Sequence, residues 1–192
     1  MARPRSEEKR NAILDAATRV IAVEGVSAPT AKIAKLARVA EGTLFTYFNN
    51  KDELLNELYV QLKAELRALM LLEAWSVAKK SPRSTALHAW TSYVNWGVAN
   101  PEKRKVVAQL SVSERITEQS RAAGMAGFTD LNAFLSQTAG SKVLRQQPAA
   151  FVGSILGAIA ETTMEFVVRD PARAEQYSQA GFEAFWNALA AK

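Results

Sequence analysis

Apolar residues recur at the spacing of helices with one buried face over almost the whole chain. Between Ser6 and Gly25, the residues Ile13, Ala17 and Ile21 fall on one side of a helical wheel. A serine before such a segment and a glycine after it are typical helix caps. The pattern therefore predicts a first helix that packs its apolar face into a core.

Two shorter segments with the same spacing follow. Thr30, placed as an N-cap after a proline, begins a helix with Ile33 and Leu36 on its apolar side. A third helix is expected at about residues 41–48, after a tight connection at residues 38–40. Three short helices with such a turn between the second and the third are typical of a helix-turn-helix.

A long fourth helix comes next. Asn50 is its expected N-cap, and Glu53 stands at the position that completes a capping box. Leucines at helical spacing continue this helix to about Leu69, and the pattern breaks at residues 79–82. We therefore predict a helix-turn-helix domain at residues 1–50, a connecting helix at residues 51–70, and a larger helical domain at residues 71–192, for which the family resemblance given below implies ligand binding and dimerisation.

The rest of the chain also has helical spacing. Proline after a capping residue predicts helix starts near residues 101 and 171. A glycine-broken region at residues 124–127 precedes a helix at about 128–138, and a strongly apolar helix covers residues 148–168. No segment alternates as strands do, so the fold class is all-α with two domains.

The last two helices have more apolar surface than one short chain covers. They either lie inside the core or pair with a second copy in an isologous homodimer. The residues expected at that dimer interface are Phe151, Ile155, Ile159, Phe182, Phe185 and Trp186.

Composition excludes several classes of function. The chain has no cysteine and one histidine, so thiolate zinc sites, disulfides and multi-histidine metal centres are not expected, and neither is a cofactor. Only the carboxylates Glu114, Glu118 and Glu161 remain for an enzyme. No apolar run approaches about 18 residues without a charge, and the first residues lack an apolar signal segment. A cytoplasmic protein without a membrane partner is expected.

Charge supports nucleic-acid binding only weakly. The formal net charge is +5, and residues 1–51 hold nine Lys and Arg against five acids. Extending this window to residue 53 adds two acids.

The third predicted helix is more informative. Gly42 and Thr46 lie opposite the apolar Leu44 and Phe48, and a glycine in a helix costs about 1 kcal/mol relative to alanine. A small outward face lets a helix enter the major groove deeply.

A series of residue types in this region, in order and at fixed spacing, matches a known pattern. The matching residues are Ile13–Ala17, Glu24, Gly25, Thr30, Ile33, Ala34, Leu36, Ala37, Gly42–Phe45, Tyr47, Phe48 and Lys51–Leu55. Over about residues 10–58 the chain resembles the TetR family of bacterial transcriptional regulators. The resemblance implies a DNA-binding helix-turn-helix, two dimerisation helices and a ligand pocket. Two departures stand out: Ala37-Arg38-Val39-Ala40 replaces alanine-glycine-valine-serine, and Phe45 replaces a tyrosine that contacts phosphate.

The residues expected to bind duplex DNA are Thr30, Lys32, Glu41, Gly42, Thr43, Phe45, Thr46, Tyr47 and Lys51. Thr30 either holds a phosphate or only caps its helix. Lys51 begins a helix, where a phosphate would offset the unfavourable dipole. Thr43 and Glu41 suit base edges. Thr46 or Tyr47 can replace the donor that Phe45 lacks.

The resemblance also implies a small-molecule effector. The residues expected to line its pocket are His88, Tyr93, Trp96, Gln109, Phe128, Phe134 and Glu161, although aromatic residues at helical spacing more often belong to an ordinary core. The sequence thus indicates a DNA-binding regulator, a repressor released from a palindromic operator by its effector. Two alternatives stay open: a helical ligand-binding protein with a degenerate DNA-binding half, and a small helical enzyme.

Overall fold

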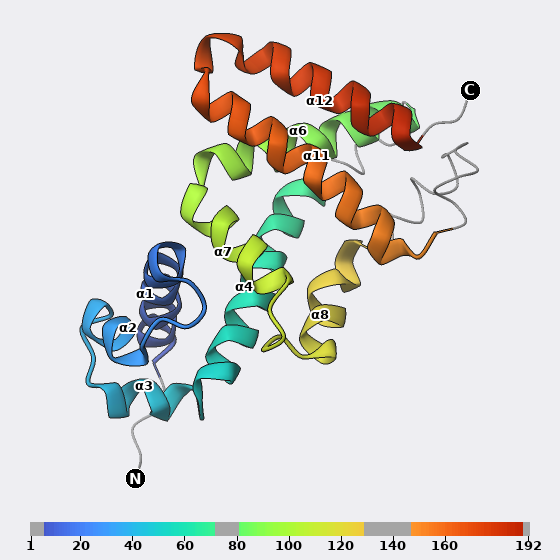
Figure 1. The fold of residues 1–192 in the computed structure, drawn as a ribbon. Coiled ribbons are helices and arrows are strands. Elements are labelled where there is room, and N and C mark those ends of the chain that lie inside the picture. Colours follow the sequence, from blue (N-terminus) through green and yellow to red (C-terminus); the bar gives the residue numbers. More distant parts are fainter. Residues whose placement is uncertain (1–5, 72–80, 129–146, 190–192) are drawn as a thin grey trace. The chain divides into compact units, whose positions relative to one another are not determined.

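The computed structural model describes residues 6–71, 81–128 and 147–189, and its regular elements there are all helical (Figure 1). The α-helices are α1 (Glu7–Glu24), α2 (Thr30–Leu36), α3 (Glu41–Tyr47), α4 (Lys51–Leu71), α6 (Pro82–Ala99), α7 (Pro101–Ser111), α8 (Glu118–Met125), α11 (Ala149–Arg169) and α12 (Ala174–Leu189). There are also two short 3-10 helices in the described residues, η1 (Ala126–Phe128) after α8 and η2 (Pro171–Arg173) before α12. The predicted all-α fold class is confirmed.

The caps of the first helices explain their bounds. The Ser6 hydroxyl accepts from the Lys9 amide at 3.4 Å, and α1 ends at Gly25 with a φ of 82°. The Asn50 side chain accepts from the Glu53 amide at 2.8 Å, as a capping box requires. The Glu53 carboxylate reaches back to the Asn49 amide at 2.7 Å, one residue before the cap.

One local prediction is wrong, since Thr30 is not an N-cap but the first helical residue after Pro29. The interruption predicted at residues 124–127 occurs after Met125, where α8 ends and η1 begins, so Gly124 itself lies within the helix. A Cβ at Gly124 would stand 2.7 Å from Tyr59 Cε1, so this glycine lets α8 pack closely on α4. Of the helix predicted at residues 128–138, only Phe128 lies within the described residues, in η1.

The chain divides into two compact units that do not follow its order. In the described residues, the first unit contains α1, α2, α3, α4 up to Ala64, α7 and α8. The second unit contains α4 from Glu65, together with α6, α11 and α12. The predicted division at residues 50 and 70 is a division by function, and it stays a prediction.

The core of the first unit forms where the sequence pattern places it. Ile33 of α2, Leu44 of α3 and Phe48 are fully buried, and α1 packs on both α2 and α7. Leu54 and Leu55 of α4 are also fully buried. α3 packs on α2 through its buried Leu44, so its opposite side faces outward.

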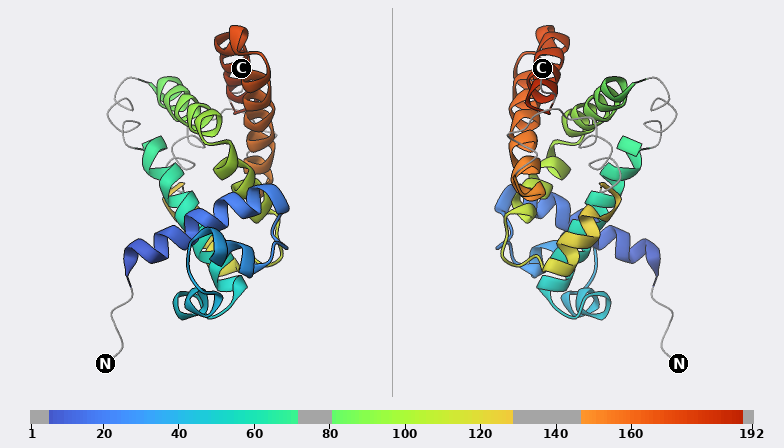
Figure 2. Two further views of the ribbon diagram at one scale, coloured as in Figure 1. Left: turned by 90° about the vertical axis from the view of Figure 1, so that its left-hand side faces the viewer. Right: turned by 90° about the vertical axis from the view of Figure 1, so that its right-hand side faces the viewer.

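The second unit packs α6 against α11 and α12, and Figure 2 shows α11 and α12 side by side in both views. Trp90 lies at its centre, with ring centroids 6.4 Å from Phe182 and 5.2 Å from Phe185. The Trp90 indole N–H donates to the Ser178 carbonyl at 3.1 Å. Gly181 allows this approach, since a Cβ there would stand 2.7 Å from Trp90 Cζ2.

Candidate nucleic-acid interface

The turn between α2 and α3 keeps a helix-turn-helix geometry with an unusual residue. Arg38 has a φ of 57°, in the left-handed region where glycine is favoured. The Val39 amide donates to the Ala34 carbonyl at 3.0 Å and closes the turn. The next helix begins after Ala40 without a side-chain cap, as the absence of a serine predicts. The turn therefore forms even though arginine replaces glycine.

The outward side of α3 is small and accessible. Gly42, Phe45 and Thr46 are exposed, whereas Leu44 is fully buried. A Cβ added to Gly42 would meet nothing within 4 Å. Internal packing therefore gives no reason for a glycine here, in contrast to Gly124. The helix can approach another molecule at this point with its backbone.

Several expected DNA-binding side chains contact each other or neighbouring residues. The Thr30 hydroxyl donates to the Glu41 carboxylate at 2.6 Å and joins the starts of α2 and α3. Lys32 forms an ion pair with Glu24 at 2.8 Å. A phosphate that bound Thr30 or Lys32 through these groups would compete with a carboxylate.

Tyr47 is better placed than Phe45 to supply a donor. Its hydroxyl oxygen accepts from the Ser6 amide at 3.1 Å, which ties the start of α1 to the end of α3. The phenol O–H remains chemically able to donate. Phe45 is 40% exposed and offers only a ring.

The first turn of α4 carries a cluster of charges. Burial lowers the pKa of Lys51 below its ordinary value, and the Arg115 guanidinium lowers it further, whereas the Asp52 carboxylate acts in the opposite direction. Arg115 Nη1 lies 2.7 Å from Asp52 Oδ1. Arg115 comes from the loop between α7 and α8, so sequence analysis, which considered only residues near the helix-turn-helix, did not find it.

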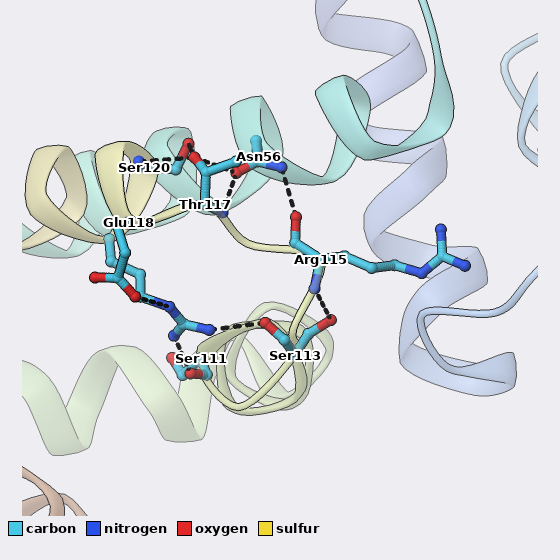
Figure 3. Close-up of polar contacts among 8 residues, drawn as sticks. Asn56, Ser111, Ser113, Arg115, Thr117, Glu118 and Ser120 are labelled. Carbon is cyan, nitrogen blue, oxygen red and sulfur yellow. Dashed lines mark hydrogen bonds and ion pairs between the residues drawn. The ribbon is translucent and has the colours of Figure 1, made fainter.

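Asn56 of α4 holds that loop (Figure 3). Its side-chain amide donates to the Arg115 carbonyl at 2.9 Å, and its carbonyl oxygen accepts from the Thr117 amide at 2.9 Å and from the Thr117 hydroxyl at 3.2 Å. Arg121 of α8 donates to the carbonyls of Ser111 and Ser113, at 2.5 Å and 2.7 Å. The loop is thus bound at both its ends.

The expected effector residues do not all come together. His88, Tyr93 and Trp96 lie on α6, and Tyr93 donates to Glu161 of α11 at 3.5 Å, within the second unit. The Tyr93 and Trp96 rings are stacked, with centroids 6.4 Å apart. Gln109, by contrast, belongs to the first unit.

Three further placements bear on the effector site. Gln109 Oε1 lies 3.9 Å from where a Gly25 Cβ would be, so it packs beside the end of α1. Phe128 is buried, and Phe134 lies outside the described residues. Glu65, which sequence analysis missed, accepts from the Trp96 indole at 3.4 Å.

The expected dimer residues divide into exposed and buried groups. Phe151 is 51% exposed, and Ile155 and Ile159 line an apolar groove of about 510 Å³ that Gly181 of α12 completes. Phe182 is fully buried in the core of its own chain, so its assignment to an interface is wrong. Phe185 and Trp186 are partly buried against that core.

The described residues contain no group of three or more His, Asp or Glu side chains that could hold a metal ion. The candidate nucleic-acid interface is made up of α3 and the first turn of α4, which the loop between α7 and α8 reaches through Arg115. A buried trihelical core that presents a short, small-faced helix after a tight turn defines a helix-turn-helix protein.

The comparison with known families is specific to this region. The family of bacterial regulatory proteins called tetR matches residues 13–58. Residues 13–58 thus carry the DNA-binding region of the TetR family of transcription regulators, and a solved structure from that family shares the fold of the chain, which favours a regulator over the enzyme alternative.

One sequence relative and three solved structures illustrate the likeness. The uncharacterized HTH-type transcriptional regulator YhgD of Bacillus subtilis is 40% identical over 63 residues, which are 32% of this chain and 33% of YhgD. The match thus spans about a third of the length of this curated relative. A TetR family transcription regulator from Shewanella sp. PV-4 has a TM-score of 0.82 and 25% identity, over 98% of this chain and 100% of that one.

Two further structures contain ligands. LfrR from Mycobacterium smegmatis, in complex with proflavine, has a TM-score of 0.68 and 19% identity, over 97% of this chain and 99% of LfrR. FadR from Bacillus subtilis, in complex with stearoyl-CoA, has a TM-score of 0.67 and 18% identity, over 94% of this chain and 99% of FadR. These two likenesses show the same fold.

Proposed function

We propose that this chain is a cytoplasmic, sequence-specific transcriptional regulator of double-stranded DNA, a repressor that a small molecule releases from a palindromic operator. The observation that carries the proposal is the open, exposed position of Gly42 on α3. A glycine in a helix is unfavourable by about 1 kcal/mol, and no internal neighbour requires it. Close approach of the helix backbone to a major groove supplies a reason.

The DNA-binding roles follow from the positions of the side chains. Thr43 and the Gly42 backbone face the base edges, whereas Tyr47 and Lys51 contact phosphates. The hydrogen bond between Thr30 and Glu41 either breaks when DNA binds, which frees both side chains for DNA contacts, or persists and orients α3. The intact turn at Arg38 argues against a degenerate DNA-binding half.

A homodimer explains the surface of α11. Phe151, Phe166 and Val168 are 51%, 41% and 52% exposed on this helix. By length and composition, residues Phe151–Arg169 could also cross a membrane, and 22% of that window is buried. Glu161 and Glu165 within the helix, however, would be costly in hydrocarbon. A second copy covering α11 and α12 gives two α3 helices related by a twofold axis, as a palindrome requires.

The effector proposal rests on chemistry within the second unit. LfrR and FadR have the same fold and bind proflavine and stearoyl-CoA. Here Tyr93, Trp96 and His88 of α6, with Glu161 of α11, combine aromatic faces with polar groups, as binding sites for organic ligands do. An effector between these helices would displace α4 and misplace both α3 helices.

The test is selection of bound duplexes from a random pool by the 192-residue chain, together with sedimentation. We expect enrichment of a palindrome whose half-sites are separated by about 10 base pairs or a multiple. Salt-insensitive binding without enrichment would instead favour the ligand-binding alternative. A stable monomer at micromolar concentration would remove the dimer and, with it, the palindrome.

A further inference from the structure

We propose that Arg115, from the loop between α7 and α8, is an additional contact to a DNA backbone phosphate beside Lys51, and that Asn56 positions it. This proposal rests on the proposed binding of duplex DNA. It adds to the helix-turn-helix a residue that lies 64 positions beyond Lys51 in the chain.

The geometry brings Arg115 to the first turn of α4. Its Nη1 lies 2.7 Å from Oδ1 of Asp52, the residue that follows Lys51, and its side chain is 47% exposed. Figure 3 shows this side chain extending away from Thr117 and Ser120, which start α8. The guanidinium therefore reaches the surface next to the proposed phosphate contact of Lys51.

The charges favour an anion at this point. Lys51 and Arg115 are two neighbouring cations, and Asp52 is the carboxylate that pairs with Arg115. Asp52 occupies one of the five N–H donors of the guanidinium, and a planar guanidinium can bind a second oxyanion through the others. A phosphate would compensate the remaining positive charge, and arginine suits it through paired hydrogen bonds.

Asn56 fixes the backbone that carries this side chain. It binds the Arg115 carbonyl and both the amide and the hydroxyl of Thr117, as described above. Ile116 between them is 3% exposed, which anchors the loop in the core. Because the loop is already ordered, a phosphate contact by Arg115 loses little conformational freedom.

The experiment measures operator affinity of the whole chain against salt concentration, using a duplex from the selection. We expect R115A to weaken binding about tenfold at 0.1 M salt on every sequence, and to reduce the log–log salt slope by about one unit. R115K should keep most of that slope. R173A is the matched control, since Arg173 pairs with Asp170 in the second unit and is also exposed; it should change neither quantity.

A double variant separates a phosphate contact from neutralisation of Asp52. If Arg115 contacts phosphate, the affinity loss persists in R115A/D52N. If D52N restores wild-type affinity and slope, Arg115 only neutralises its neighbour and the proposal is overturned. Failure of the wild-type chain to bind any duplex would refute the proposed function itself, which R115A alone cannot do.

The positioning role of Asn56 has its own readout. N56A should weaken operator binding in the wild type and add little in the R115A background, because both changes remove the same contact. Thermal unfolding of each variant checks that it is folded at the assay temperature. Fully additive losses in N56A/R115A would show that Asn56 acts independently of Arg115.

Discussion

Replacing Gly42 with alanine separates the demands of folding from those of DNA binding. The new methyl group would meet nothing within 4 Å, so the folded chain gains helix propensity without a clash. The expected stabilisation is about 0.5–1 kcal/mol, because Gly42 lies in the first turn of a short helix. For a chain of this size, that corresponds to an increase in Tm of roughly 1–4 °C.

The same methyl group should harm DNA binding. If the α3 backbone lies against the groove at Gly42, a Cβ pushes the helix outward and weakens every contact that α3 makes. We expect operator affinity, measured by fluorescence anisotropy, to fall at least about tenfold, a loss of about 1.4 kcal/mol or more. Affinity as tight as that of the wild type, with the Tm increased, would refute the close approach of α3.

A matched control is available in the second unit. Gly153 of α11 also has nothing within 4 Å of an added Cβ and is exposed. Gly153→Ala should increase Tm similarly and leave operator affinity unchanged, in samples whose dimer content sedimentation shows to be equal. This comparison separates the added methyl group from its position.

Three further changes test packing, the turn and a buried charge. Gly181→Ala should lower the free energy of unfolding by about 1–3 kcal/mol or more, measured in urea, because its Cβ would overlap Thr163 Oγ1 and stand 2.7 Å from Trp90 Cζ2. Arg38→Gly should increase Tm, since relief of a left-handed arginine is worth about 1–2 kcal/mol, less the entropy that glycine adds to the unfolded chain; an unchanged or lower Tm would mean that arginine is unstrained there. Lys63→Met should stabilise the chain at pH 7, because burial lowers the pKa of Lys63. The folded protein loses this proton before the unfolded chain does, so wild-type stability rises with pH and the advantage of methionine should shrink towards pH 10.5; an advantage independent of pH would contradict this.

The features that the sequence predicts correctly are those that depend on a single helix. Leu44 and Phe48 are buried and Gly42 is exposed, as the helical spacing of this one segment predicts. The caps at Ser6 and Asn50 follow from residue type and spacing over a few positions. These features depend only on residues that are close to each other in the sequence.

The features that the sequence does not predict depend on distant partners. Gly124 lies inside α8 and makes room for Tyr59, a packing role that the sequence does not reveal because Tyr59 lies more than sixty residues earlier. Phe182 appeared available to a second copy, because a helical period cannot say whether an apolar side faces its own chain or another. The position of Arg115 depends on Asn56 in the same way.

The first unit is built from two segments, residues 1–64 and 100–126, that are separated in the sequence and therefore in the order of synthesis. Val106, Val107 and Leu110 of α7 are buried, and α7 packs on α1, so a fragment ending at residue 64 would expose apolar surface of α1 and leave Asn56 without the loop. We therefore expect the isolated helix-turn-helix not to fold stably without α7 and the loop that follows it. On the ribosome it leaves the exit tunnel before α7 and α8, and its core is complete only after about 60 more residues, which take roughly 3–12 s to synthesise. During that interval the nascent DNA-binding unit is an exposed apolar surface that chaperones can bind.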